Sequence, residues 1–275
     1  MDYKDQKLPP SNYAVLRWFG FDQFVPETAV TSHWVSPKVF LAIRSLLALY
    51  STIVIWTDIG FDAYHGKFTG FFAFFTNLTF IGLHAYLITS TVHHIRYLRN
   101  KNVDSFLKQP AVLNYLYVYL YCTVITNNIV TPVVFWGILA RYLGPISTMQ
   151  SWLNASVHGA SFFLMIFDVI FNRMKVPIRM ILFVFFTVVL YMLLTFIVHA
   201  SAGYWVYPFL DWKQGPITAA YYFAVAVIVV LAFFIQVLIH YVRDLIARKT
   251  ARSHQNTVSD SQDMTKLETN HSNVV

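Results

Sequence analysis

The chain has 275 residues, of which 57% are apolar, 18% aromatic and 12% charged, and its formal net charge is +7. Globular domains carry about 25% charged residues and must face water on the outside, so the composition argues against a soluble domain and against a disordered chain. The basic residues lie between apolar blocks, which indicates contacts with anionic membrane lipids rather than with nucleic acid.

Residues 1–37 form a polar segment without a cleavable signal peptide, which we expect to lie in the cytosol. A bilayer core of about 30 Å needs about 20 apolar residues per helix. Stretches of this kind predict an all-α, polytopic membrane domain of about six helices over residues 38–242: Val39–Trp56, Gly70–Ile88, Val112–Leu139, Trp152–Phe171, Met180–Val198 and Ile217–Tyr241. The third is over-long, and Pro132 inside it predicts a kink or an early end.

The connections between the predicted spans differ in charge. Lys and Arg gather in the second and fourth connections and after the last span, whereas the first, third and fifth hold few. The positive-inside rule therefore predicts that both termini are cytosolic. The tail, residues 243–275, is polar beyond Ser253 and is expected to be disordered. The endoplasmic reticulum, another endomembrane and the plasma membrane all fit this pattern.

Thr76, Asn77, Asn154 and His158 are polar residues inside predicted spans, where polar groups are costly and point to function. Thr76 lies about six residues into the second span and His158 about six into the fourth, and both spans enter from the non-cytosolic side. At a rise of about 1.5 Å per residue, both side chains would lie roughly 9 Å below that surface. Asn154 is four residues before His158 and shares its helix face.

A threonine hydroxyl near an imidazole is a pattern of nucleophilic catalysis on an ester. The imidazole takes the hydroxyl proton as the oxygen attacks the carbonyl, then returns it to the leaving alcohol. Asn77 or Asn154 would hold the ring tautomer or donate to the oxyanion. Structural roles stay open as well, because threonine often bonds its own helix backbone and histidine often bridges helices.

The connection after the fifth predicted span is rich in aromatic residues and helix breakers. His199, at its start, would either join the same pocket or be hydrated at the interface. Tyr204 and Tyr207 would form a substrate-binding rim or belong to an interfacial aromatic belt. Asp211 would orient a histidine or be solvated.

Two charged residues lie in the spans away from these groups. Asp168 is about ten residues beyond the histidine of the fourth span, roughly 15 Å along the helix, so we expect it to pair with a basic residue or to bond across the bundle. Arg44 is expected to snorkel toward the cytosol. The single cysteine, Cys122, excludes a cysteine metal site, and His93 and His94 fall short of the histidine set of membrane desaturases. We predict no metal and no cofactor.

Three short motifs stand in order along the chain: Phe-Phe-Thr76, Trp152-Leu-Asn154-x-x-x-His158 and Trp205-Val-Tyr-Pro-Phe-Leu210. With these motifs, the chain from about Val39 to Tyr241 resembles the androgen-induced-gene family of integral membrane proteins. The pieces around Phe75-Thr-Asn and Val157-His-Gly are also similar to the related rolling-stone group, which is linked to cell fusion.

Members of the first family are multi-pass hydrolases of fatty acid esters of hydroxy fatty acids, and they use an intramembrane threonine and histidine. The resemblance implies Thr76 as nucleophile and His158 as base, with a lipid ester reaching the site from the bilayer. Thr79 is a rival nucleophile on much the same helix face. A non-enzymatic fusion or scaffold protein of rolling-stone type stays open, as does a transporter, which would more often show paired broken helices. Protein partners and oligomeric state stay unknown.

Overall fold

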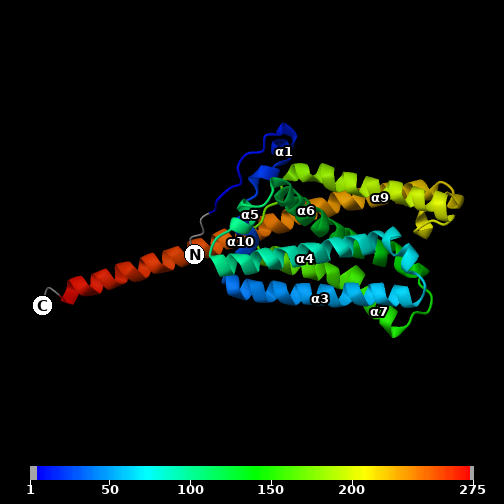
Figure 1. The fold of residues 1–275 in the computed structure, drawn as a ribbon. Helices are drawn as coiled ribbons and strands as arrows, with labels where there is room; N and C mark the ends of the chain where they lie inside the picture. The colour runs from blue at the N-terminus through cyan, green and yellow to red at the C-terminus, as the bar shows by residue number, and fades with distance from the viewer. Residues whose placement is uncertain (1–4, 273–275) are drawn as a thin grey trace.

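The computed structural model describes the backbone of residues 5–272 and the side chains of residues 5–251. Every regular element in that part is helical, which confirms the predicted all-α fold (Figure 1). The α-helices are α1 (Ala14–Phe19), α2 (Pro26–Val30), α3 (Pro37–Tyr64), α4 (Phe75–Asn100), α5 (Asp104–Leu107), α6 (Ala111–Val134), α7 (Thr148–Ala155), α8 (Ser161–Phe171), α9 (Ile181–Ala202) and α10 (Ile217–Ser272).

Shorter helical turns lie between these helices. Two of them are π turns, η3 (Phe135–Leu139) and η5 (Ser156–Ala160). The others have the tighter 3-10 geometry: η1 (Phe21–Gln23), η2 (Phe68–Ala73), η4 (Ala140–Tyr142), η6 (Ile178–Met180), η7 (Pro208–Leu210) and η8 (Trp212–Gln214).

Within the described part of the chain, five segments are long and apolar enough to cross a membrane, which makes this an integral, multi-pass membrane protein: Pro37–Tyr64, Ala111–Tyr142, Thr148–Phe171, Ile178–Ala202 and Ile217–Ala251. The remaining predicted span corresponds to α4, which is 26 residues long but is not among the five. Its threonine, histidine and asparagine residues dilute its apolar stretch. It nevertheless lies inside the bundle, against α3 and α6.

The start of α4 differs from the predicted boundary in a way that matters for the site. We predicted a span over Gly70–Ile88, but Phe68–Ala73 is a 3-10 turn and the α-helix follows it. Thr76 is therefore the second residue of its helix, whereas His158 is the eleventh residue counted from Thr148, the start of α7. The equal depth predicted for the two side chains rested on helix starts that the structure does not have.

Capping residues explain some of the other boundaries. Ser36 caps α3 by accepting the Val39 N–H, and a proline follows at the first helical position. Ser147 and Gln150 form a capping box that starts α7 earlier than predicted. Gly203 ends α9 in the left-handed conformation, with φ +74°.

Helix α6 forms the centre of the bundle. In its most apolar window 61% of the residues are buried, against 11% in the span that contains α9. It packs against α4, α8, α9 and α10, and α9 and α10 contact each other along one side of the bundle. The apolar outer face of α9 therefore faces the surroundings of the protein, as a lipid-facing helix does.

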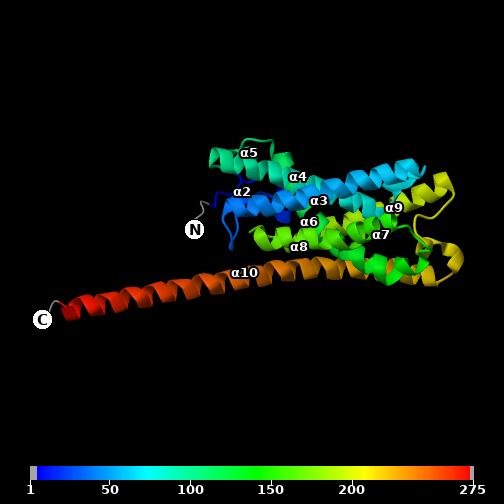
Figure 2. The same cartoon turned by 90° about the horizontal axis from the view of Figure 1, so that it is seen from below.

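The segment before α3 folds onto one end of the bundle, where Phe21, Phe24 and Val30 join the main apolar core. Beyond that end α10 continues as a single helix away from the other helices (Figure 2). Side chains after Ala251 lie outside the described residues, so the disorder expected for 253–275 stays a prediction. The cytosolic placement of both termini stays a prediction as well.

A buried charged cluster, defined here as Arg44, Tyr86, Asp168 and Asn172, joins α3, α4 and α8. The Arg44 Nε donates to Asp168 Oδ1 at 2.7 Å, and Tyr86 donates to Oδ2 at 2.6 Å. Asn172 Nδ2 also donates to Oδ2, at 3.1 Å. The pairing predicted for Asp168 is confirmed. The snorkelling predicted for Arg44 is wrong, because its side chain is fully buried in this ion pair.

Candidate functional site

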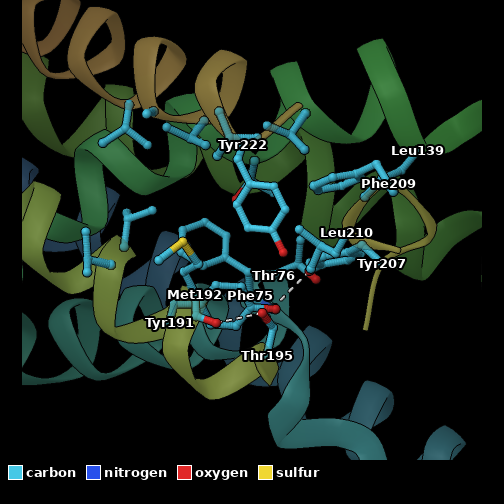
Figure 3. Close-up of a pocket in the computed structure, with 18 of the residues that line it drawn as sticks. Phe75, Thr76, Leu139, Tyr191, Met192, Thr195, Tyr207, Phe209, Leu210 and Tyr222 are labelled. Carbon is cyan, nitrogen blue, oxygen red and sulfur yellow. Dashed lines mark hydrogen bonds between the residues drawn. The ribbon is translucent and has the colours of Figure 1, made fainter. Parts of the chain in front are cut away.

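A pocket of about 140 Å³ lies where the start of α4, the end of α6, α9, the first turns of α10 and the loop before α10 meet (Figure 3). Its wall is mostly valine, leucine and phenylalanine. Only six lining side chains carry a hydroxyl group: Thr76, Thr131, Tyr191, Thr195, Tyr207 and Tyr222. An apolar pocket with a few convergent polar groups is the usual form of a small-molecule site.

The first turn of α4 is fixed by two tyrosines from outside that helix. The Phe75 N–H donates to the hydroxyl oxygens of Tyr191 and Tyr207, at 3.0 Å each. Tyr191 in turn donates to the Ala73 carbonyl at 2.9 Å. These bonds begin the helix at Phe75, so that Thr76 in its first turn lines the pocket. The N–H groups of a first helical turn have no acceptors within the helix, and they give this end of α4 a partial positive charge.

Tyr207 lies in the loop between α9 and α10 and is buried. Burial raises the pKa of its phenol, while hydrogen bonds with Tyr191, Phe75 and Thr76 oppose that shift without reversing it. The phenol is therefore protonated at neutral pH. Its oxygen accepts the Phe75 N–H and also interacts with Thr76, so Tyr207 holds the first turn of α4 in place.

His158 lies on the π turn η5, which packs against α4 and α6. Its Nδ1 is 3.0 Å from the carbonyl oxygen of Asn154. A carbonyl only accepts, so Nδ1 must carry the hydrogen, and in the neutral ring the lone pair is on Nε2. This is the tautomer that a general base needs.

Phe135 connects His158 to the pocket. The two rings are stacked, with centroids 3.6 Å apart and planes 17° from parallel. Phe135 lines the cavity, whereas His158 is one ring removed from it. Both residues lie on π turns, which occur often at functional sites. Thr76 and Phe135 thus line the same pocket, and His158 lies behind Phe135 without a hydrogen bond to Thr76 in the described chain.

The comparison with family models decides the family. Residues 43–241 match the model described as "FAR-17a/AIG1-like protein". The chain belongs to this family. No curated protein and no solved structure was found to match the chain. The match spans most of the chain and includes the whole pocket, and it confirms the resemblance to the androgen-induced-gene family.

Other residues predicted for the site of this FAR-17a/AIG1-like chain lie on α4 but outside the cavity. The Asn77 side-chain amide donates to the Phe71 carbonyl at 3.0 Å, which holds η2 against the helix start. The Thr79 hydroxyl donates to the Thr76 carbonyl at 2.9 Å. Of the two threonines considered as nucleophile, Thr76 alone lines the pocket.

The remaining predicted residues also lie outside the cavity. Asn154 acts through its backbone carbonyl on His158. His199 stacks on Trp205, with ring centroids 4.0 Å apart. Tyr204 is 43% exposed. The carboxylate of Asp211 accepts the Lys213 N–H and caps a short turn, so it orients no histidine.

Of the six lining residues that carry a hydroxyl, sequence reasoning missed four: Thr131, Tyr191, Thr195 and Tyr222. It also missed Phe135, which has no distinguishing local pattern, since phenylalanine is frequent throughout the spans. The four hydroxyl residues carried a signal, because each places a hydroxyl inside an apolar span. That signal was shared with many other threonines and tyrosines of the chain.

Proposed function

We propose that this chain is a membrane-embedded hydrolase of lipid esters, with Thr76 as nucleophile and His158 as general base. The observation that carries the proposal is the position of Thr76 at the amino end of α4, in a mostly apolar pocket between helices. The family membership and the Nδ1–H tautomer of His158 support it.

The proposed reaction has two halves. The Thr76 oxygen attacks the ester carbonyl as Nε2 of His158 takes the hydroxyl proton; the C–O bond to the alcohol breaks, and the imidazolium returns the proton to the leaving oxygen. Water then cleaves the threonine ester in the same way and releases the fatty acid. The negative oxygen of each intermediate is stabilised by O–H and N–H donors at the start of α4.

This reaction requires the Phe135 ring to leave its stack on His158. While the rings are stacked, Phe135 lines the cavity in place of the imidazole. A change of the Phe135 rotamer would open the path from Nε2 to Thr76. The stacked arrangement is then the resting state, and a bound substrate favours the open one by contacting the imidazole.

The substrate enters from the bilayer, between α9 and α10. Most of the lining residues on these helices are half-buried, among them Phe185 and Val188 of α9 and Val225 of α10, whereas Val130 of α6 is buried. A cavity of about 150 Å³ holds one benzene ring, so this one holds the ester and a few carbons. Longer chains extend toward lipid, where burial adds little net affinity because the chains start in an equally apolar medium.

Hydrolysis of a fatty acid ester of a hydroxy fatty acid by the purified protein in lipid vesicles tests the proposal. Thr76→Ala and His158→Asn should each lower the rate at least about a thousandfold. Asparagine keeps a donor near the Nδ1 position, so His158→Asn removes the base with little change in structure. Thr79→Val is the matched control on α4 and should keep most of the activity. Equal rates for wild type and Thr76→Ala would refute the proposal.

A further inference from the structure

Thr131 and Tyr222 line the same pocket, and neither hydroxyl makes a hydrogen bond of normal geometry within residues 5–251. The Trp212 indole N–H acts on the Tyr222 oxygen, but the Tyr222 O–H has no acceptor in that part of the chain. Thr131 is on α6 and is 2% exposed, so its side chain lies deep in the protein. Tyr222 is on α10, and Figure 3 shows its hydroxyl pointing into the cavity. Buried hydroxyls without partners are rare and ask for an explanation.

Thr131 differs from other threonines of α6, because its hydroxyl makes no hydrogen bond among the residues that the structure describes. On the same helix Thr123 donates to the carbonyl of Tyr119, and Thr126 is within hydrogen-bond distance of the Cys122 carbonyl. Threonines commonly satisfy their hydroxyls in this way. Thr131 instead lines the cavity and makes no such bond.

Tyr222 departs from other buried tyrosines of the bundle in the same way. Tyr86 donates to a carboxylate, Tyr121 bonds His240, and Tyr191 bonds the Ala73 carbonyl. The Tyr222 O–H reaches the interior of an apolar pocket and has no acceptor in the described chain, although the Trp212 indole N–H acts on its oxygen. A phenylalanine would fill the same space without leaving an unpaired hydroxyl.

We propose that Thr131 and Tyr222 bind the ester group of the lipid substrate, with Tyr222 donating to its carbonyl oxygen. This inference rests on the proposed function and names the groups that recognise the substrate. A ligand made only of hydrocarbon leaves both hydroxyls unpaired, whereas a lipid with an oxygen inside its chain pairs them. The pocket therefore selects chains that carry a carbonyl within the hydrocarbon, and rejects plain chains of equal length.

Thermal unfolding in detergent tests this selection without any chemistry at Thr76. The probes are a long-chain ketone, which has a carbonyl but no bond to cleave, and the alkane of equal length. In the wild type the ketone should raise the Tm more than the alkane. In Tyr222→Phe and in Thr131→Val this difference should disappear. Without ligand both variants should unfold at or above the wild-type Tm, because each loses an unpaired buried hydroxyl.

Matched controls come from hydroxyls that do have partners. Thr123→Val, on the same helix, and Tyr119→Phe, whose hydroxyl bonds Thr187, both lie outside the pocket. Each should lower the Tm without ligand and leave the ketone–alkane difference as in the wild type. This pattern is opposite to the one expected for Tyr222→Phe and Thr131→Val.

A ketone–alkane difference that persists in Tyr222→Phe and Thr131→Val would overturn the inference, and would assign the two hydroxyls to water. A Tm without ligand that falls as in the controls would also overturn it, because the hydroxyls would then be bonded within the protein. Failure of the hydrolase proposal gives a different result. In that case Thr76→Ala would not change the rate of ester hydrolysis, while the ketone–alkane difference would still depend on Tyr222.

Discussion

The buried charged cluster and the pocket both hold polar side chains inside the same apolar bundle, but the two regions differ in how those side chains are hydrogen-bonded. In the cluster, both carboxylate oxygens of Asp168 accept hydrogen bonds, from Arg44 and from Tyr86 and Asn172. In the pocket, the hydroxyls of Thr131 and Tyr222 have no hydrogen-bond acceptor within the described chain. One nitrogen of the cluster, Nη2 of Arg44, also lacks a partner there, but it lies outside the pocket. An unpaired polar group therefore suggests ligand binding only where it lines a cavity.

Helix α4 carries both regions. Thr76 is in its first turn, and Tyr86 of the cluster is ten residues further on, about 15 Å along the helix. The cluster joins α4 to α3 and α8, while Tyr191 and Tyr207 hold its first turn against α9 and the following loop. The cluster thus fixes the helix that presents Thr76 to the pocket.

Breaking the buried ion pair should have the largest effect on stability. Asp168→Leu leaves the Arg44 guanidinium buried without its counter-charge, and we expect a loss of about 3–5 kcal/mol in the free energy of unfolding. The double variant Arg44→Met with Asp168→Leu removes both charges and should recover most of that loss. Denaturant unfolding in detergent measures both. A single variant within about 1 kcal/mol of the wild type would show that the pair is not what holds α3 to α8.

Removing one tyrosine hydroxyl from each region compares them directly. Tyr86→Phe takes a donor from the Asp168 carboxylate and should cost about 1.5–3 kcal/mol, as bonds to charged groups do. Tyr222→Phe removes a hydroxyl without a partner and should cost nothing in the ligand-free protein. Equal losses in the two variants, measured by the same unfolding experiment, would erase the distinction between cluster and pocket.

Replacing Phe135 tests whether its ring controls access to the imidazole. Phe135→Leu removes the stack on His158 and keeps an apolar side chain in the wall. If the open state is populated at roughly 10% or less in the wild type, the hydrolysis rate should rise roughly tenfold. A rate as low as that of His158→Asn would mean that the ring positions the imidazole for catalysis instead of separating it from the substrate.

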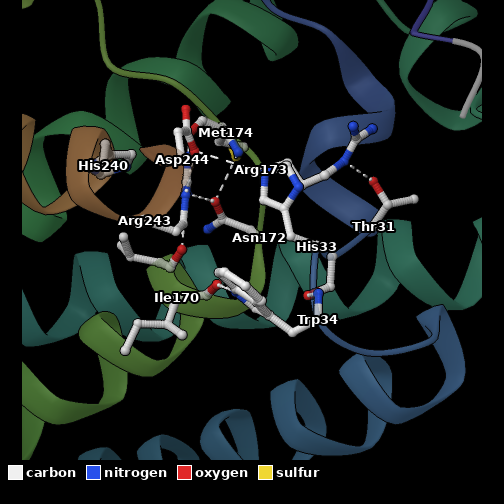
Figure 4. Close-up of polar contacts among 12 residues, drawn as sticks. Thr31, His33, Trp34, Ile170, Asn172, Arg173, Met174, His240, Arg243 and Asp244 are labelled. Carbon is white, nitrogen blue, oxygen red and sulfur yellow. Dashed lines mark hydrogen bonds and ion pairs between the residues drawn. The ribbon is translucent and has the colours of Figure 1, made fainter. Parts of the chain in front are cut away.

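The smallest expected effect is a pH dependence at the end of the bundle where the N-terminal segment docks (Figure 4). His33 lies before α3, with Nε2 3.8 Å from Asp244 Oδ1. Burial lowers its pKa, Arg173 and Arg243 lower it further, and Asp244 and Asp5 oppose them. The unfolded segment binds a proton on His33 more tightly than the docked segment does. The docked segment is therefore most stable above a pH of about 6.5, where His33 is neutral in both states, and it becomes less stable as the pH falls below that value.

Amide hydrogen exchange measures this docking. After correction for the intrinsic pH dependence, residues 14–34 should exchange faster at acidic pH than at neutral pH. His33→Gln should remove the difference, since glutamine does not titrate. A difference that survives in His33→Gln would assign the pH dependence to other groups, such as Glu27, whose pKa is raised chiefly by burial.

The membrane fold could be predicted from the sequence because span length and apolar composition are local properties. The start of α4 could not, since Tyr191 and Tyr207 set it from more than a hundred residues away. The burial of Arg44 could not be predicted either, because it depends on the ion pair with Asp168, which lies on another helix. Thr76 was found because its position and the family motif agree. Tyr222 was missed because the lack of a partner is a property of the packed bundle and not of a sequence pattern.

The most direct test of the account is to locate the covalent adduct of a lipid-like fluorophosphonate by peptide mass spectrometry. Thr76 should carry the adduct in the wild type and in Thr79→Val, and labelling should be slow in His158→Asn and absent in Thr76→Ala. An adduct on Thr79 or on any other residue, or a wild type that stays unlabelled while it hydrolyses lipid esters, would contradict the assignment of Thr76 as nucleophile.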